Sequence, residues 1–231
     1  MVRDMHRRLA ALALLVASAL PAAAQETVPL ELVLLAEASG SITQAEIAFQ
    51  RQGYAAALRS PEVAAALAST GGVAITYVEW AANTGTVAPW TVIRSEADAA
   101  AFAESVLAPP RMAGGRNAIG GALLSALALM EGNGVEGLRR VVDFSGDSAN
   151  NYSGPSIAEA REALLSAGVT INALALACRA CGAPRPGVVE AYEREVIGGP
   201  GAFVVAVEAE ESFAETVQRK LVAEILLGAL D

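Results

Sequence analysis

The chain has 231 residues, 54% of them hydrophobic, and a formal net charge of −9 at pH 7. Such an acidic surface is repelled by phosphate backbones, which argues against nucleic acid as a partner. The only histidine is His6. A chain that loses its N-terminus therefore has no histidine for nucleophilic catalysis, general-base catalysis or zinc binding.

The N-terminus has the three-part layout of a cleavable secretory signal. Residues 1–8 are short and basic, residues 9–20 form an apolar run too short to span a bilayer comfortably, and residues 22–24 are alanines. We therefore expect a signal peptide over residues 1–24, cleaved at its end, and a mature domain over residues 25–231. An uncleaved anchor helix is the alternative.

The expected mature domain carries 13 basic and 24 acidic residues, a net charge near −11. It has no later apolar stretch long enough to span a membrane. We therefore predict a periplasmic or secreted protein with no membrane span after signal cleavage.

Short apolar runs alternate with amphipathic stretches through the rest of the chain. In chain order, we expect strands at 30–35, 73–80, 86–93, 139–144, 169–177 and 202–207. We expect helices at 43–58, 95–107, 119–130, 156–167, 188–197 and 211–230. This alternation predicts a doubly wound α/β domain, a Rossmann-like three-layer sandwich whose mostly parallel sheet has helices on both faces. Pro89 indicates that its strand lies at the sheet edge.

Oxygen-bearing side chains follow three of the predicted strands or precede the helices after them. In such sheets a ligand site lies beyond the carboxyl ends of the strands. The first strand runs into a Glu-Ala-Ser-Gly-Ser loop, a Gly-Gly loop precedes the second long helix, and a Ser-Gly-Asp loop follows the fourth major strand. The candidate metal ligands are Glu37, Ser39, Ser41, Asn117 and Asp147. Few carboxylates and several neutral oxygens suit a hard cation such as Mg²⁺ or Ca²⁺.

The order of these motifs resembles the von Willebrand factor A domain. In that family an Asp-x-Ser-x-Ser loop, a Thr and an Asp form a metal-ion-dependent adhesion site (MIDAS), whose metal accepts a carboxylate from a partner. The chain is more similar still to a bacterial subfamily of exported A-like proteins of unknown function. That similarity rests on Gln50–Tyr54, Tyr77–Trp80, Ser145–Asp147, Ile197–Gly201 and Arg219–Val222. The resemblance implies an A-like fold over nearly the whole mature chain and a protein partner.

The candidate site departs from the family pattern at two positions. Glu37 stands where the family has Asp, and a longer arm suits Ca²⁺ better than Mg²⁺. Asn117 stands where the family has Thr, beside the cation Arg116. The site is then either a divalent-cation site or a degenerate one. In a degenerate site, Ser39 and Ser41 cap the first helix and Asp147 accepts backbone hydrogen bonds. If the site is lost entirely, Arg116 is expected in the metal position.

Cys178 and Cys181 form a Cys-Arg-Ala-Cys motif after a predicted strand. In an exported chain with two cysteines this spacing favours a structural disulfide that closes a small loop. A redox or metal motif is the alternative.

The predicted function is that of an exported binding, adhesion or scaffolding domain, not of an enzyme, because no catalytic motif is found. The alternative is an envelope hydrolase or phosphate-handling enzyme with a carboxylate-held metal. Such an enzyme would draw on Glu37, Asp147 and either Asp143 or Glu79. Trp80 and Trp90 are either an aromatic contact surface at the top of the sheet or part of the core.

Overall fold

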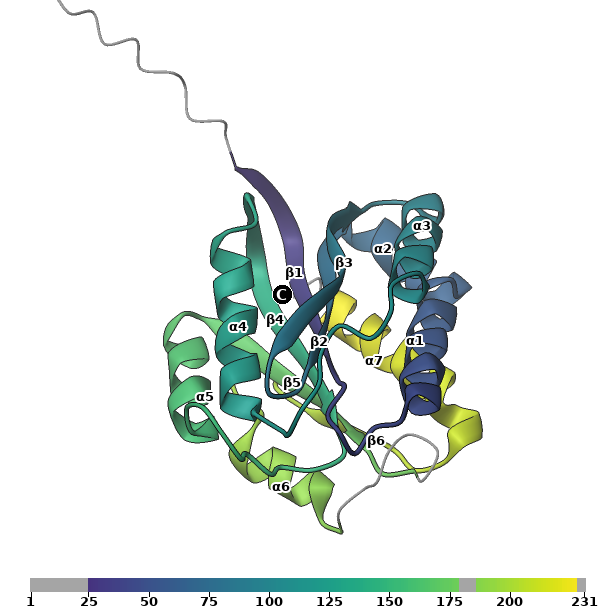
Figure 1. The fold of residues 1–231 in the computed structure, drawn as a ribbon. Coiled ribbons are helices and arrows are strands. Elements are labelled where there is room, and N and C mark those ends of the chain that lie inside the picture. The colour runs from purple at the N-terminus through teal and green to yellow at the C-terminus, as the bar shows by residue number, and fades with distance from the viewer. Residues whose placement is uncertain (1–24, 179–185, 228–231) are drawn as a thin grey trace, which may run out of the picture.

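The computed structural model describes residues 25–178 and 186–227 (Figure 1). Its strands are β1 (Glu26–Glu37), β2 (Val73–Trp80), β3 (Thr84–Ile93), β4 (Val135–Gly146), β5 (Val169–Leu176) and β6 (Val204–Val207). Its helices are α1 (Gln44–Leu58), α2 (Pro61–Thr70), α3 (Glu96–Leu107), α4 (Ile119–Glu131), α5 (Ile157–Ser166), α6 (Val188–Glu195) and α7 (Phe213–Leu226), with a 3₁₀ turn, η1 (Glu210–Ser212), before α7.

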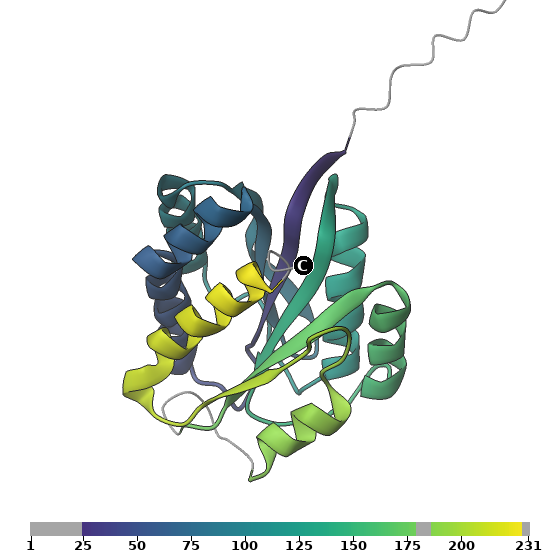
Figure 2. The ribbon, with the colours of Figure 1, turned by 180° about the vertical axis from the view of Figure 1, so that it is seen from behind.

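The six strands form one sheet in the order β3-β2-β1-β4-β5-β6. All neighbouring strands are parallel except β2 and β3, which are antiparallel. Helices α1, α2, α3 and α7 cover one face, and α4, α5 and α6 cover the other (Figures 1 and 2). The predicted doubly wound α/β architecture is therefore confirmed, and the strand that contains Pro89 lies at an edge of the sheet.

Both faces of the sheet carry a hydrophobic core. Along β1, Leu32 and Leu34 belong to the core under α1 and α7, whereas Val33 and Leu35 belong to the core under α4 and α5. Successive side chains of a strand point to opposite faces, so a strand buried on both sides needs an unbroken apolar run. This requirement explains why the sequence pattern predicted the central strands.

The two tryptophans are structural. Trp80 is fully buried, stacks on Phe144 with 4.9 Å between ring centroids, and donates from Nε1 to the Ser145 carbonyl at 3.0 Å. Trp90 is partly buried and donates from Nε1 to the Leu129 carbonyl of α4 at 3.2 Å. The interpretation of these rings as core and edge cover is therefore the one that the structure supports.

The largest differences from the prediction concern helix α2 and strands β1 and β4. Helix α2 was missed, although Ser60 caps it by accepting from the Val63 amide and Pro61 occupies its first turn. Strands β1 and β4 begin earlier than predicted, because their first halves pair with each other through a stretch that lacks apolar alternation.

A buried ionic cluster joins α7 to the sheet. Lys220 Nζ lies 2.6 Å from Asp143 Oδ1 and 2.5 Å from Glu224 Oε1, and Asn172 Nδ2 donates to the same Glu224 oxygen at 2.9 Å. All four residues are at most 2% exposed. Asp143 thus holds the lysine of α7 and does not support the loops at the sheet top.

The cluster predicts a pH dependence of stability. Burial, and then the charge of Asp143, raises the pKa of Glu224 to about 7. The folded state therefore binds this proton more tightly than the unfolded state, so the stabilisation is complete below the ordinary Glu pKa and is lost as the pH rises through about 7. We expect Glu224→Gln, which keeps an oxygen for Lys220 and Asn172, to be more stable than the unmodified chain at pH 8 by ~1–3 kcal/mol.

Urea unfolding at pH 5 and pH 8 measures this difference. Glu215→Gln, at a solvent-exposed ion pair on the same helix, is the matched control and should leave the pH dependence unchanged. If Glu224→Gln is no more stable than the unmodified chain at pH 8, the buried charge of Glu224 does not destabilise the fold and the prediction is wrong.

Candidate functional site

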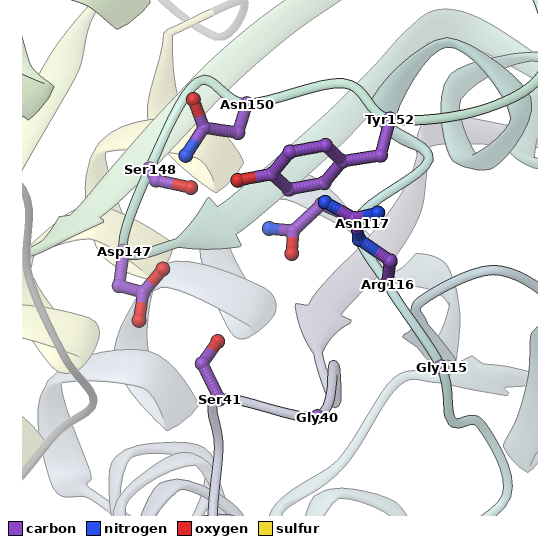
Figure 3. Close-up of a pocket in the computed structure, with 9 residues that line it drawn as sticks. All are labelled: Gly40, Ser41, Gly115, Arg116, Asn117, Asp147, Ser148, Asn150 and Tyr152. Carbon is purple, nitrogen blue, oxygen red and sulfur yellow. The ribbon is translucent and has the colours of Figure 1, made fainter.

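The five predicted ligand residues come together at the carboxyl ends of the strands. Three of them, Ser41, Asn117 and Asp147, line a hollow of 220 Å³ at the top of the sheet, and Figure 3 shows their polar ends directed into it. The hollow is completed by Gly40, Gly115, Arg116, Ser148, Asn150 and Tyr152. The loops after β1 and β4 and before α4 therefore form one site.

Glu37 lies beneath this hollow and joins its three loops. Its Oε1 accepts from Ser39 Oγ at 2.6 Å and from Asn117 Nδ2 at 2.8 Å. Its Oε2 accepts from the backbone amide of Asp147 at 2.9 Å. Both oxygens are engaged and the residue is 1% exposed, so Glu37 joins the loops from below and is not among the residues that line the hollow.

The environment of Glu37 favours its protonated form. Burial, followed by the nearby charge of Asp147, raises the pKa of Glu37 to about 7. The three donated hydrogen bonds act in the opposite direction. The approach is close: a Cβ built on Gly146 would lie 2.7 Å from Glu37 Oε2 and 2.7 Å from the Tyr192 hydroxyl. The Ser-Gly-Asp loop thus needs its glycine so that the longer acidic side chain fits.

The two serines have different positions. Ser39 is buried, and its hydroxyl lies 2.8 Å from that of Ser41, which is exposed at the hollow. Helix α1 is capped by Thr43, which forms a capping box with Glu46. The interpretation of the serines as helix caps is therefore wrong, whereas Ser41 remains available to a ligand.

Arg116 does not lie between the oxygen donors. Its guanidinium carbon is 3.9 Å from the centre of the Tyr152 ring. Figure 3 shows it against this ring, on the other side of Asn117 from Asp147 and Ser41. The structure therefore does not place Arg116 in the metal position that the loss of the site would predict. A cation–π contact of this kind keeps the arginine at the rim of the hollow.

An arginine that the sequence did not single out holds the loops together. Arg111, between α3 and α4, donates to the carbonyls of Ala38, Ser39 at 2.5 Å and Ile42 at 3.1 Å. Its Nε donates to Ala113 at 2.9 Å. One side chain thus satisfies the carbonyls of the serine loop and fixes it against the loop before α4. No local motif marks this role, because the partners are distant in sequence.

Glu79, a carboxylate of the alternative enzyme hypothesis, is neutralised by its own cation. Its Oε1 accepts from Arg51 at 2.9 and 2.6 Å, and its Oε2 accepts from the Met112 amide at 2.7 Å. Asp143 is paired with Lys220 in the same way. Over residues 25–178 and 186–227, no three His, Cys, Asp or Glu side chains form a group that could hold a metal ion. The arrangement therefore gives no support to a carboxylate-held catalytic metal.

The residues at the hollow fit a hard cation with few charged ligands. Asn117 commits its amide nitrogen to Glu37, which leaves Oδ1 as its acceptor. Together with the Ser41 hydroxyl and the Asp147 carboxylate, this makes a set of oxygen donors with one formal charge. Glu37 and Ser39 fit as supports of this set and not as its members.

Two further predictions fall partly outside the described residues. Cys178 is buried at the end of β5, but Cys181 belongs to residues 179–185, so the disulfide stays a prediction. The signal peptide over residues 1–24 also lies outside the described ranges. Within those ranges no helix has the length and apolar character needed to cross a membrane.

The chain has a von Willebrand factor A-like fold, as the sequence motifs predicted. The chain belongs to the family described as protein of unknown function (DUF1194), whose model matches residues 27–228. A comparison with curated proteins gives no match.

Several solved structures share this fold at low sequence identity. Proximal thread matrix protein 1 from the mussel byssus has a TM-score of 0.64 and 14% identity, and the match covers 87% of this chain and 48% of that one. A von Willebrand factor type A protein from Catenulispora acidiphila has a TM-score of 0.57 and 15% identity, and the match covers 84% of this chain and 42% of that one. The pilus adhesin SpaC from Lactobacillus rhamnosus GG has a TM-score of 0.60 and 12% identity, and the match covers 87% of this chain and 30% of that one. The chain thus spans less than half of each of these proteins. A further structure of the mussel protein, with a TM-score of 0.58, has zinc in its MIDAS motif.

The buried position of Glu37 predicts a structural cost when it is removed. Glu37→Ala leaves the Asp147 amide and the Asn117 side chain without their acceptor, so we expect the free energy of unfolding to fall by ~3 kcal/mol or more. Urea unfolding followed by circular dichroism measures this loss. Ser41→Ala, in the exposed part of the same loop, is the matched control and should stay within ~0.5 kcal/mol of the unmodified chain. Equal midpoints for the two variants would show that Glu37 does not organise the loops.

Proposed function

We propose that the mature chain, residues 25–231, is an exported binding or adhesion domain that holds a protein partner at the loops on top of the sheet. The signal-like N-terminus supports a periplasmic or secreted location. The observation that carries the proposal is the open hollow where Ser41, Asn117 and Asp147 meet at the top of the sheet. Adhesin and matrix-protein structures of the same fold support an adhesive role.

The site is a degenerate form of the metal-ion-dependent adhesion site. Ser41, Asn117 and Asp147 would hold a divalent cation, and Glu37 would keep them in place from below. A bound cation would supply an open coordination position for an acidic group of the partner. With one carboxylate at the hollow, we propose weak affinity and a preference for Ca²⁺ over Mg²⁺, because Ca²⁺ tolerates irregular geometry better.

The rim of the hollow also has a positive charge of its own. Arg116 is exposed, is held over Tyr152 and lines the hollow together with Asn117 and Asn150. A planar guanidinium recognises carboxylates in a bidentate manner. Partner binding at this surface is therefore proposed with or without a cation, and the two cases are separable by chelation.

A calorimetric titration of the mature chain with Ca²⁺, Mg²⁺ and Mn²⁺ tests the cation. We expect weak binding, with Kd on the order of 10⁻⁴–10⁻³ M, that is lost in Asp147→Ala because this change removes the one carboxylate at the hollow. Glu62→Ala, an exposed carboxylate at the start of α2, is the control and should bind as the unmodified chain does. Absence of heat with any of the three cations at millimolar concentration would exclude the metal-dependent form of the site.

Capture of partners from the native envelope tests the binding surface itself. Mature chain immobilised on beads is expected to retain a protein that Asp147→Ala or Arg116→Ala retains at least about tenfold less, since each change removes a group of the hollow. Arg219→Ala, an exposed arginine on α7, is the control. Loss of capture with a chelator assigns it to the cation, and capture that resists the chelator but needs Arg116 assigns it to the guanidinium. Equal capture by all variants would place the binding surface elsewhere and refute the proposal.

A further inference from the structure

The first half of β4 extends past its neighbour β5. Strand β4 begins at Val135, whereas its ladder with β5 begins only at Arg140, opposite Val169. Residues 135–139 therefore pair with β1 on one side and, within the part of the chain that the structure describes, with no strand on the other. Figures 1 and 2 both show the first halves of β1 and β4 running together beyond the rest of the sheet.

The backbone groups on this open side belong to Glu136 and Leu138. The carbonyl of Val135 faces β1, since it accepts from the side chain of Gln25 just before that strand. Successive residues of a strand direct their backbone groups to alternate sides. The backbone groups of Arg140 point to the same side as those of Glu136 and Leu138, and Arg140 pairs with β5. The segment therefore presents an N–H and a C=O from each of these two residues along the line that β5 would occupy if it were longer.

We call the space beside this edge, which a longer β5 would occupy, the lane. Cavities lie along the lane on both faces of the sheet. On the face of α7 there is a cavity of 620 Å³, bounded on its far side by Thr170, Pro200 and Leu227. On the face of α4 and α5 there is a cavity of 540 Å³. Both cavities are lined by Leu138, Arg140 and Gly168. Leu138 is 75% exposed, and an open edge with an exposed apolar side chain is a template for a further strand.

The lane also contains the guanidinium group of Arg139. Arg139 is partly buried and lines the larger cavity. It donates from Nη2 to the carbonyl of Glu224 at 3.0 Å and forms no ion pair with any residue in the described ranges. Burial lowers the pKa of this guanidinium, and the nearby charge of Glu224 only partly opposes that effect. A guanidinium without an ion pair can accept a carboxylate of a ligand at this one point, through charge-assisted hydrogen bonds.

We propose that residues 135–139 of β4 bind an extended, acidic segment of a partner protein, which adds a strand beside β4 and places a carboxylate on Arg139. Backbone hydrogen bonds to Glu136 and Leu138 supply the affinity, and Arg139 supplies the preference for acidic sequences. A second copy of this chain fits less well, because pairing two such edges brings both Arg139 side chains onto one face of a short ladder. So short a ladder also buries far less than the ~1,200 Å² of a stable interface. This site lies at the opposite end of the strands from the hollow and does not rest on the proposed function.

Selection from a displayed library of short random peptides on the mature chain, followed by fluorescence anisotropy, tests this proposal. The selected peptides are expected to be rich in Asp and Glu and to bind Leu138→Pro at least about tenfold more weakly. Proline removes the N–H that faces the lane and none that faces β1. Leu138→Thr keeps the N–H and a β-forming side chain, so it is the matched control and should bind nearly as the unmodified chain does.

A second variant tests the charge without changing the backbone. Arg139→Gln is expected to abolish the preference for a selected peptide over the same peptide with its acidic residues changed to amides, whereas Arg59→Gln at an exposed ion pair leaves that preference intact. Hydrogen exchange is expected to show protection of residues 135–139 in the complex. Asp147→Ala should leave peptide binding unchanged, so failure of one site is distinguishable from failure of the other.

Three results would overturn the proposal. Selected peptides that lack acidic residues, or that bind Leu138→Pro and Arg139→Gln as tightly as the unmodified chain, would show that this edge does not bind an acidic strand. Protection at the loops on top of the sheet, in place of residues 135–139, would move the ligand elsewhere. A dimer detected by sedimentation of the unmodified chain and lost in Leu138→Pro would make a second copy the occupant.

Discussion

The buried carboxylate of Glu37 is the interaction on which the top of the sheet depends. Three loops from distant parts of the chain meet there, and each donates one hydrogen bond to it. A buried acceptor with three donors fixes the loops relative to one another, and it penalises any arrangement that leaves one of these donors unmatched. The Glu37 carboxylate lies beneath the hollow, whose lining includes Asp147 but not Glu37. In this structure Glu37 therefore supports the loops, and its role as a metal ligand stays a prediction.

Three other buried carboxylates, Glu79, Asp143 and Glu224, lie in ion pairs with buried cations of the same chain. Glu79 is paired with Arg51 under the loop before α4, and Asp143 shares Lys220 with Glu224 under α7. Removing the arginine or the lysine from these pairs is costly, because it leaves a carboxylate charge in a region of low dielectric. These pairs therefore fix helices and loops to the sheet, and Asp147 remains as the carboxylate at the hollow. An acidic composition alone did not distinguish structural carboxylates from ligands.

The sequence predicted what is local or periodic. Apolar strands that alternate with helices gave the layers, and the carboxyl ends of parallel strands placed Glu37, Asn117 and Asp147 in one site. Helix α2 was missed because its alanines lack a clear apolar stripe, and the first half of β4 because its polar residues pair with β1 on an incompletely covered part of the sheet. The roles of Arg111 and of Arg51 depend on contacts across more than 25 residues, which no local pattern encodes.

The open edge of β4 follows from the same architecture that makes the hollow. The central strands of this sheet, β1 and β4, are the longest, and on the side of β4 the strands β5 and β6 become successively shorter. Where β5 begins late, at Val169, the preceding turn leaves the lane beside residues 135–139 open, and α4 and α7 flank it only from above and below the sheet. The two ends of one strand layer therefore present different chemistry. Side-chain oxygens gather where the strands end, and backbone groups stay unpaired where they begin, so a ligand at one end needs organised loops and a ligand at the other needs only an extended chain.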